Sequence, residues 1–81
     1  MSKAPNRRNI SGRCIAEARG HARPPLTQEE LSGKLALLGI QLDRAAVAKI
    51  ESDRRGVLDF ELKAIAEALE VSVDWLLGGS R

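Results

Sequence analysis

The 81-residue sequence contains few aromatic side chains, one cysteine and one histidine, and each scarcity excludes a class of protein. Because Phe60 and Trp75 are the only aromatic residues, a core must be built from aliphatic side chains. Cys14 alone cannot form a disulfide framework, which is typical of a protein in a reducing cytoplasm. His21 has no neighbouring nucleophile or second metal-ligating side chain in the sequence. We therefore expect no catalytic residue, no metal site and no cofactor.

Long apolar runs are also missing. The longest span only a few residues, far fewer than the roughly 20 that a transmembrane helix needs. The N-terminal sequence MSKAPNRRN is charged but lacks the apolar region of a signal peptide. There is no glycine-rich phosphate loop and no serine in a nucleophile-elbow pattern. These absences predict a cytoplasmic protein with no membrane contact and no enzymatic activity.

Charge is nearly balanced in total but uneven along the chain. Thirteen Lys and Arg against eleven Asp and Glu give a formal charge of +2. Positions 1–23 hold six Lys and Arg and one acidic residue, whereas acidic residues concentrate after position 58. A surface with one basic end favours a phosphate-bearing partner. On composition alone, a set of solvating charges explains the pattern equally well.

A chain of this length accommodates one hydrophobic core, so we expect a single domain. Residues 1–8 carry charges without periodicity, which is typical of a disordered basic arm. Residues 9–79 form the expected domain, with apolar side chains at helical spacing. The expected helices are one from Asn9 to Gly20, two over about 28–38 and 44–52, one capped by Asp59, and a last one capped by Ser72.

Sequence signals for helix starts and ends predict that only a short segment separates the second and third helices. Thr27 and Glu30 form a capping box, and Asp43 can cap the third helix. Gly39 suits the left-handed turn that ends the second helix, so only a short turn separates the two. Two helices joined in this way are typical of a helix-turn-helix, whose second helix lies in the major groove of DNA.

The third helix carries few long side chains on its outer face. If Val47 and Ile50 face the core, the outward residues are Arg44, Ala45, Ala48 and Lys49. Alanines allow close approach to base edges and can contact the thymine methyl group, and an arginine can donate two hydrogen bonds to guanine. An ordinary surface helix with two solvated charges explains the same spacing, and the residues alone leave both interpretations open.

Three segments carry a resemblance to a known family. LTQEELSGKL, VAKIES and LKAIAEALEVSVDWLLGG, in this order, resemble the helix-turn-helix domain of the Cro and phage-repressor (XRE) family of bacterial transcription regulators. The match runs from residue 10 to residue 78. It implies an all-α, compact, five-helix lambda-repressor-like domain. It also implies a sequence-specific transcriptional regulator, a repressor that binds a two-fold symmetric double-stranded DNA operator as a homodimer.

The resemblance also implies roles for individual residues. Gln28 matches a glutamine that contacts the DNA backbone and braces the third helix. Arg19 and Glu51 match an ion pair inside the domain. The base-contacting positions are Arg44, Ala45, Ala48 and Lys49. The phosphate-contacting positions are Gln28, Ser52, Arg54 and Arg55.

The sequence departs from the family pattern at two places, and a second class of function stays open. ALLGIQL lengthens the turn between the second and third helices, and GHARPP lengthens the linker before the second helix. The longer turn changes the angle between the two helices and hence which side chains reach the bases, and the longer linker leaves open whether His21 and Arg23 reach the DNA backbone. The alternative function is a protein-interaction module, or an antitoxin that binds a toxin and its own operator. Either would bring a regulatory protein partner.

Overall fold

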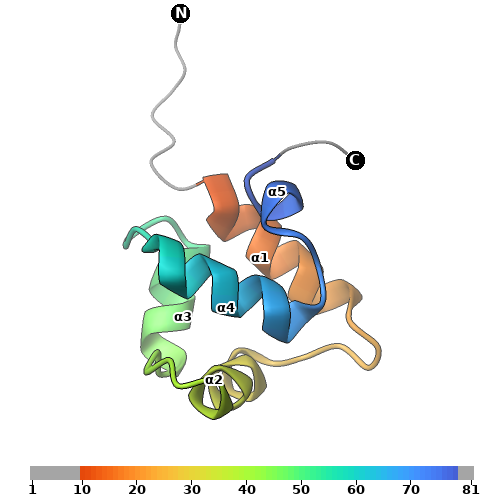
Figure 1. The fold of residues 1–81 in the computed structure, drawn as a ribbon, viewed down its shortest axis with the longest axis vertical. Helices are drawn as coiled ribbons and strands as arrows, with labels where there is room; N and C mark the ends of the chain where they lie inside the picture. Colours follow the sequence, from red (N-terminus) through yellow and green to blue (C-terminus); the bar gives the residue numbers. More distant parts are fainter. Residues whose placement is uncertain (1–9, 79–81) are drawn as a thin grey trace, which may run out of the picture.

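The computed structural model describes residues 10–78, and these residues form five helices without a strand (Figure 1). The helices are α1 (Ile10–His21), α2 (Gln28–Leu37), α3 (Arg44–Glu51), α4 (Asp59–Leu69) and α5 (Val73–Leu76). This confirms the prediction of an all-α, five-helix domain. The predicted basic arm of residues 1–8 lies outside the described residues.

Local side-chain chemistry sets most of the helix starts. The Thr27 hydroxyl accepts a hydrogen bond from the Glu30 amide at 3.0 Å, and the Glu30 carboxylate accepts one from the Thr27 amide at 2.8 Å. Asp43 and Ser72 cap α3 and α5 in the same way, through the amides of residues 46 and 75. Each bond satisfies a backbone amide that the first helical turn leaves without a partner.

The start of α4 differs from the prediction. Asp59 is the first residue of the helix rather than its cap, and Leu58 takes the capping position without a side-chain hydrogen bond. The Glu61 carboxylate instead accepts a hydrogen bond from the Leu58 amide at 3.0 Å. The predicted Asp59 cap is therefore wrong, because the carboxylate two residues later reaches back to the helix start.

The core is aliphatic, as the shortage of aromatic residues predicts. Its largest fully buried side chains come from all five helices: Ile15, Leu31, Leu35, Val47, Ile50, Ile65 and Leu76. Phe60 is 58% exposed, and Trp75 is only partly buried against the core. α1, α2 and α4 thus surround one core, with α3 packed against α1 and α2, and α5 against α1 and α4 (Figure 1).

Gly12 marks the closest approach between α1 and α3. A methyl group added to Gly12 would overlap the backbone carbonyl of Ile50, and backbone cannot rotate away as a flexible side chain can. The absence of a side chain at position 12 therefore sets the distance between α1 and the end of α3.

We expect Gly12→Ala to destabilise the domain by about 1–3 kcal/mol, because α1 must move away from α3 to make room. Gly33→Ala is the matched control, since nothing lies near its added methyl group and alanine is a better helix former. Urea unfolding of both variants measures the difference. Equal stability of the two variants would contradict the close packing of α1 on α3.

Candidate nucleic-acid interface

The turn between α2 and α3 is held by its own hydrogen bonds. Gly39 adopts the left-handed conformation with φ +85°, as its sequence position predicts, and the Ile40 amide donates to the Leu35 carbonyl at 2.9 Å. The Ser32 hydroxyl on α2 donates to the Leu42 carbonyl at 2.7 Å. The turn that departs from the family pattern is thus tied back to α2 just before α3 begins.

The outer face of α3 carries the four side chains that the sequence assigns to it. Val47 and Ile50 are 2% and 1% exposed and anchor the inner face in the core. The residues that point away from the core are Arg44, Ala45 and Lys49, which are exposed, and Ala48, which is partly exposed. The helix therefore presents two long cationic side chains separated by small ones.

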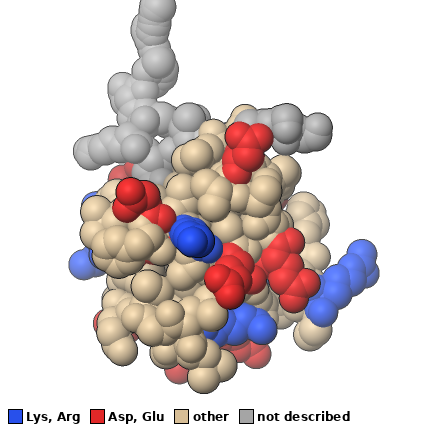
Figure 2. All heavy atoms as spheres, viewed as in Figure 1, with Lys and Arg blue, Asp and Glu red and all other residues tan. Residues whose placement is uncertain are grey.

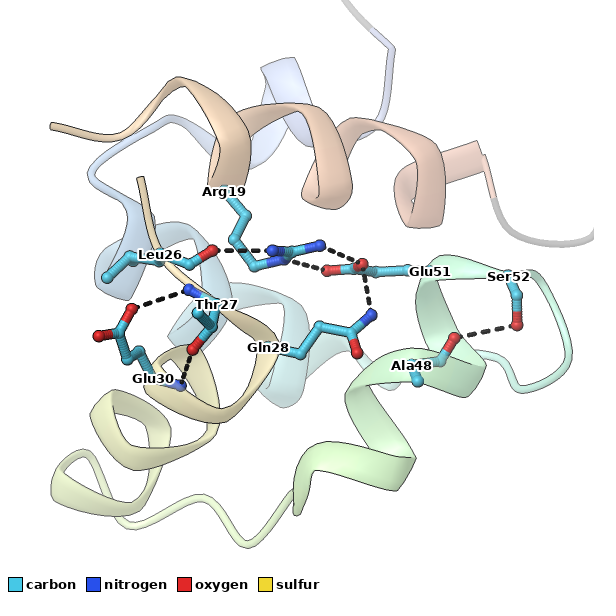
Figure 3. Close-up of polar contacts among 8 residues, drawn as sticks. All are labelled: Arg19, Leu26, Thr27, Gln28, Glu30, Ala48, Glu51 and Ser52. Atoms are coloured by element: carbon cyan, nitrogen blue, oxygen red, sulfur yellow. Dashed lines mark hydrogen bonds and ion pairs between the residues drawn. The ribbon is translucent and has the colours of Figure 1, made fainter. Parts of the chain in front are cut away.

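Three side chains from three helices meet beside the end of α3 (Figure 3). The Arg19 guanidinium on α1 donates to both carboxylate oxygens of Glu51, through Nε at 2.9 Å and Nη2 at 3.0 Å. The Gln28 side-chain amide on α2 donates to Glu51 Oε1 at 3.0 Å. A third arginine bond, from Nη1 at 2.7 Å, reaches the Leu26 carbonyl just before α2. Glu51 thus links α3 to both α1 and α2.

This network is shielded from water. The Glu51 side chain is 7% exposed and the Arg19 side chain 21%. The pKa of Arg19 lies above its ordinary value, mainly because of the hydrogen bond to Glu51. Burial acts in the opposite direction and lowers this pKa. Two parallel bonds between guanidinium and carboxylate also fix direction. The network therefore sets the orientation of α3 relative to the start of α2.

The Gln28 side chain uses only one of its polar groups in this network. One amide N–H is bound to Glu51, while within residues 10–78 its carbonyl oxygen accepts no hydrogen bond. As the first residue of α2, it stands at the positive end of the helix dipole. Its predicted contact with a phosphate stays a prediction.

The segment after α3 turns sharply at Asp53, which has φ +63°. The Arg54 amide donates to the Lys49 carbonyl at 2.8 Å, which closes the turn, and the Arg54 side chain is exposed. The Ser52 hydroxyl donates back to the Ala48 carbonyl at 2.9 Å (Figure 3). The Ser52 hydroxyl oxygen can therefore accept a hydrogen bond from another molecule, and the Arg54 side chain places a positive charge beside α3.

Arg55 is bound into the structure of the loop. Its guanidinium donates to both carboxylate oxygens of Glu61, at 3.0 and 3.1 Å, and to the Gly56 carbonyl at 2.9 Å. Glu61 also accepts from the Leu58 amide, so one carboxylate joins the loop to the start of α4. The structure thus gives Arg55 a role in holding the loop, and its predicted phosphate contact is not tested.

The Glu61 carboxylate makes stability depend on pH. The hydrogen bond from Arg55 is the main cause that lowers the pKa of Glu61 below its ordinary value. A lowered folded-state pKa stabilises fully above the unfolded pKa of about 4.3, and this contribution is lost as the pH falls through the folded value. As the pH falls below about 4.3, we expect Glu61→Gln to lose less of its free energy of unfolding than the wild type loses. Urea unfolding across pH, with the exposed Glu17→Gln as control, measures this, and parallel curves for all three proteins would contradict it.

Several of these contacts have no clear signal in the sequence. The bond from Ser32 to the Leu42 carbonyl depends on the path of the longer turn. Hydrophobic periodicity in the sequence does not specify that path. The pairing of Arg55 with Glu61 requires the loop to fold back on α4. A glycine inside a helical pattern, as at position 12, was the one available indication of a close approach.

Residues 10–78 contain no group of three or more His, Cys, Asp or Glu side chains placed to hold a metal ion. None of the helices in this range has the length and apolar character needed to span a membrane.

Comparison with known proteins identifies this arrangement. A family model described as helix-turn-helix (HTH_3) matches residues 26–76, which include α2, α3, α4 and α5. No curated protein and no solved structure matches the chain. The family match covers more than half of the sequence and contains the turn between α2 and α3. The chain therefore belongs to the XRE-type helix-turn-helix family of Cro and repressor-type DNA-binding regulators.

Proposed function

We propose that this protein is a transcriptional repressor that binds a two-fold symmetric operator in double-stranded DNA as a homodimer. One observation carries the proposal: α3 presents Arg44, Ala45, Ala48 and Lys49 outward while Glu51, at its end, is held from both α1 and α2. A rigidly oriented helix with small residues between two cations fits the major groove.

In this proposal, base contacts and phosphate contacts belong to different parts of the interface. Arg44 lies in the first turn of α3, where side chains reach base edges, and it can recognise guanine through O6 and N7. The alanines bring the helix axis close to the bases. Gln28, Ser52 and Arg54 contact the phosphates on either side and fix the register of α3.

The small reading surface supports a dimer on a two-fold operator. Four side chains on one α3 specify only a few base pairs, and each wrong pair costs about 1–3 kcal/mol. Two copies on inverted half-sites double the number of bases read. Repression then follows from occupancy, because a protein that fills the major groove keeps other proteins from the same DNA.

The experiment that tests this function is selection of bound sequences from a random duplex pool at two salt concentrations. We expect an enriched motif with inverted half-sites about one helical turn apart. Affinity should fall with salt, with a slope of about 0.9 per phosphate neutralised. Retention of all sequences alike, lost at higher salt, would contradict sequence-specific binding and favour the protein-interaction function. A single half-site would contradict the dimer.

A further inference from the structure

Three shallow hollows lie along the C-terminal end of α4, the first against α2, the second against the linker before α2, and the third against the end of α1 and α5. The first is lined by Lys34, Leu37, Leu38, Glu67, Ala68 and Glu70. The second shares Lys34, Ala68 and Glu70 with it and extends to Arg23 and Leu69. The third shares Arg23, Leu69 and Glu70 with the second and ends at Val71 and Trp75. Because Glu70 lines all three, they form a continuous surface, which we call the α2–α4 groove.

One end of the α2–α4 groove exposes large apolar side chains. Leu37 is 88% exposed and Leu38 40%, and they follow each other at the end of α2. Ala68 faces the same hollow from α4. Adjacent exposed leucines beside a groove are typical of an interaction surface, whereas scattered single ones need no explanation.

The two banks of the groove carry opposite charges. Lys34 and Arg23 lie on the side of α2 and the linker before it, and Glu67 and Glu70 lie at the end of α4. All four are exposed, and within residues 10–78 none of them takes part in an ion pair. Figure 2 shows acidic and basic groups lying beside one another on the face that carries α4, with no large area of one sign.

Glu70 departs from ordinary helix-ending chemistry in two ways. It adopts the left-handed conformation, φ +58°, where glycine is the usual residue. Its carboxylate and that of Glu67 also lie at the negative end of the α4 dipole, where the last turn has no basic residue. Residues that break local rules in this way are found at functional sites. A cation supplied from outside would stabilise both carboxylates.

The groove lies on the flank of α2 away from α3. Gln28 and Ser32 occupy the opposite flank, because they bond to Glu51 and to the carbonyl just before α3. Lys34 and Leu38 face α4 instead. An occupant of the groove therefore leaves the outer face of α3 uncovered.

We propose that the α2–α4 groove binds a second copy of this chain. A two-fold axis along the groove places the basic bank of one copy against the acidic bank of the other, twice, and brings the leucine ends together. Two-fold interfaces require this kind of self-complementary surface. The contact would be the interface of the homodimer proposed above, on which this inference rests, and since α3 stays uncovered it joins molecules that are each able to bind DNA.

Charge reversal tests this pairing in the absence of DNA. Glu70→Lys makes the groove basic, and Lys34→Glu makes it acidic. By sedimentation at low salt, we expect wild-type self-association, at least about tenfold weaker association of each variant alone, and recovery in an equimolar mixture. Recovery on mixing is expected when the basic bank of one copy contacts the acidic bank of the other, and not when the variants have lost association through misfolding. Leu37→Ser should also weaken association, since its side chain contributes little inside the domain.

Matched controls separate this interface from general charge effects. Glu17→Lys and Lys63→Glu change exposed residues outside the groove by the same charges, and we expect both to associate like the wild type. Phe60→Ser removes an exposed aromatic side chain at the other end of α4 and should also have no effect. The proposal is overturned if the wild type stays monomeric at every concentration, if the groove variants associate as well as the wild type, or if the controls weaken association equally. None of these results depends on whether an operator exists.

Discussion

Reversing both cationic side chains on the outer face of α3, with Arg44→Glu and Lys49→Glu together, is expected to lower DNA affinity at least about 100-fold at moderate salt. Two attractive contacts are lost, and two carboxylates are placed against the negative charge of the DNA. Both residues are exposed, and within residues 10–78 their side chains make no hydrogen bond or ion pair, so the fold should persist. Fluorescence anisotropy with the selected operator measures the loss, and the unfolding midpoint checks the fold.

The matched control for this pair changes the same charge elsewhere. Arg13→Glu on α1 and Lys63→Glu on α4 are both exposed, and together they lower the net charge equally. We expect only a small fall in affinity, because long-range attraction is screened within about 10 Å at 0.1 M salt. If the two double variants bound DNA equally weakly, net charge rather than the outer face of α3 would control binding.

The single variants divide the two roles. Arg44→Ala should reduce discrimination at one position of each half-site, as expected for a side chain that contacts a base. If Lys49 contacts a phosphate, Lys49→Ala should weaken binding to all sequences alike and lower the salt slope by about one. The spacing of the two residues leaves both possibilities for Lys49, and this measurement decides between them.

The helix starts were predictable where the chemistry is local. Thr27 with Glu30, and Asp43 with the amide three residues later, are bonds within one helical turn, so the sequence contains all of their parts. Gly39 likewise needs only its own backbone conformation. The start of α4 was mispredicted because two carboxylates, at positions 59 and 61, compete for it, and the sequence does not show which one bonds back to residue 58.

Contacts between distant segments were accessible only in part. The ion pair of Arg19 and Glu51, 32 residues apart, came from the family resemblance and not from spacing. The bond of Ser32 to the turn and the two bonds of Arg55 to Glu61 depend on how this chain's own loops run. The resemblance gives no position for such loops, since the turn here is longer than the family's. For the same reason, the α2–α4 groove had no sequence signal.

Among the polar residues of the interface, Glu51 is the one whose loss is expected to destabilise the domain most. Glu51→Ala leaves the Arg19 guanidinium, 21% exposed, without its carboxylate and removes the acceptor of the Gln28 amide. Removing one partner of a buried pair costs about 3–5 kcal/mol, and the partial exposure of Arg19 places this one near the lower end, about 3 kcal/mol. A small domain has only about 3–5 kcal/mol of stability in total, so much of the variant should be unfolded.

Urea unfolding of three variants separates the charge from the hydrogen bonds. Glu51→Gln keeps a side-chain oxygen for Gln28 but loses the charge facing Arg19, so we expect it to remain nearly as unstable as Glu51→Ala. Glu29→Ala, an exposed carboxylate on the first turn of α2, should cost less than about 1 kcal/mol. Recovery of stability when Arg19 is replaced by Met in the Glu51→Ala background would show that the uncompensated guanidinium causes the loss. Wild-type stability of Glu51→Ala would mean that packing alone orients α3.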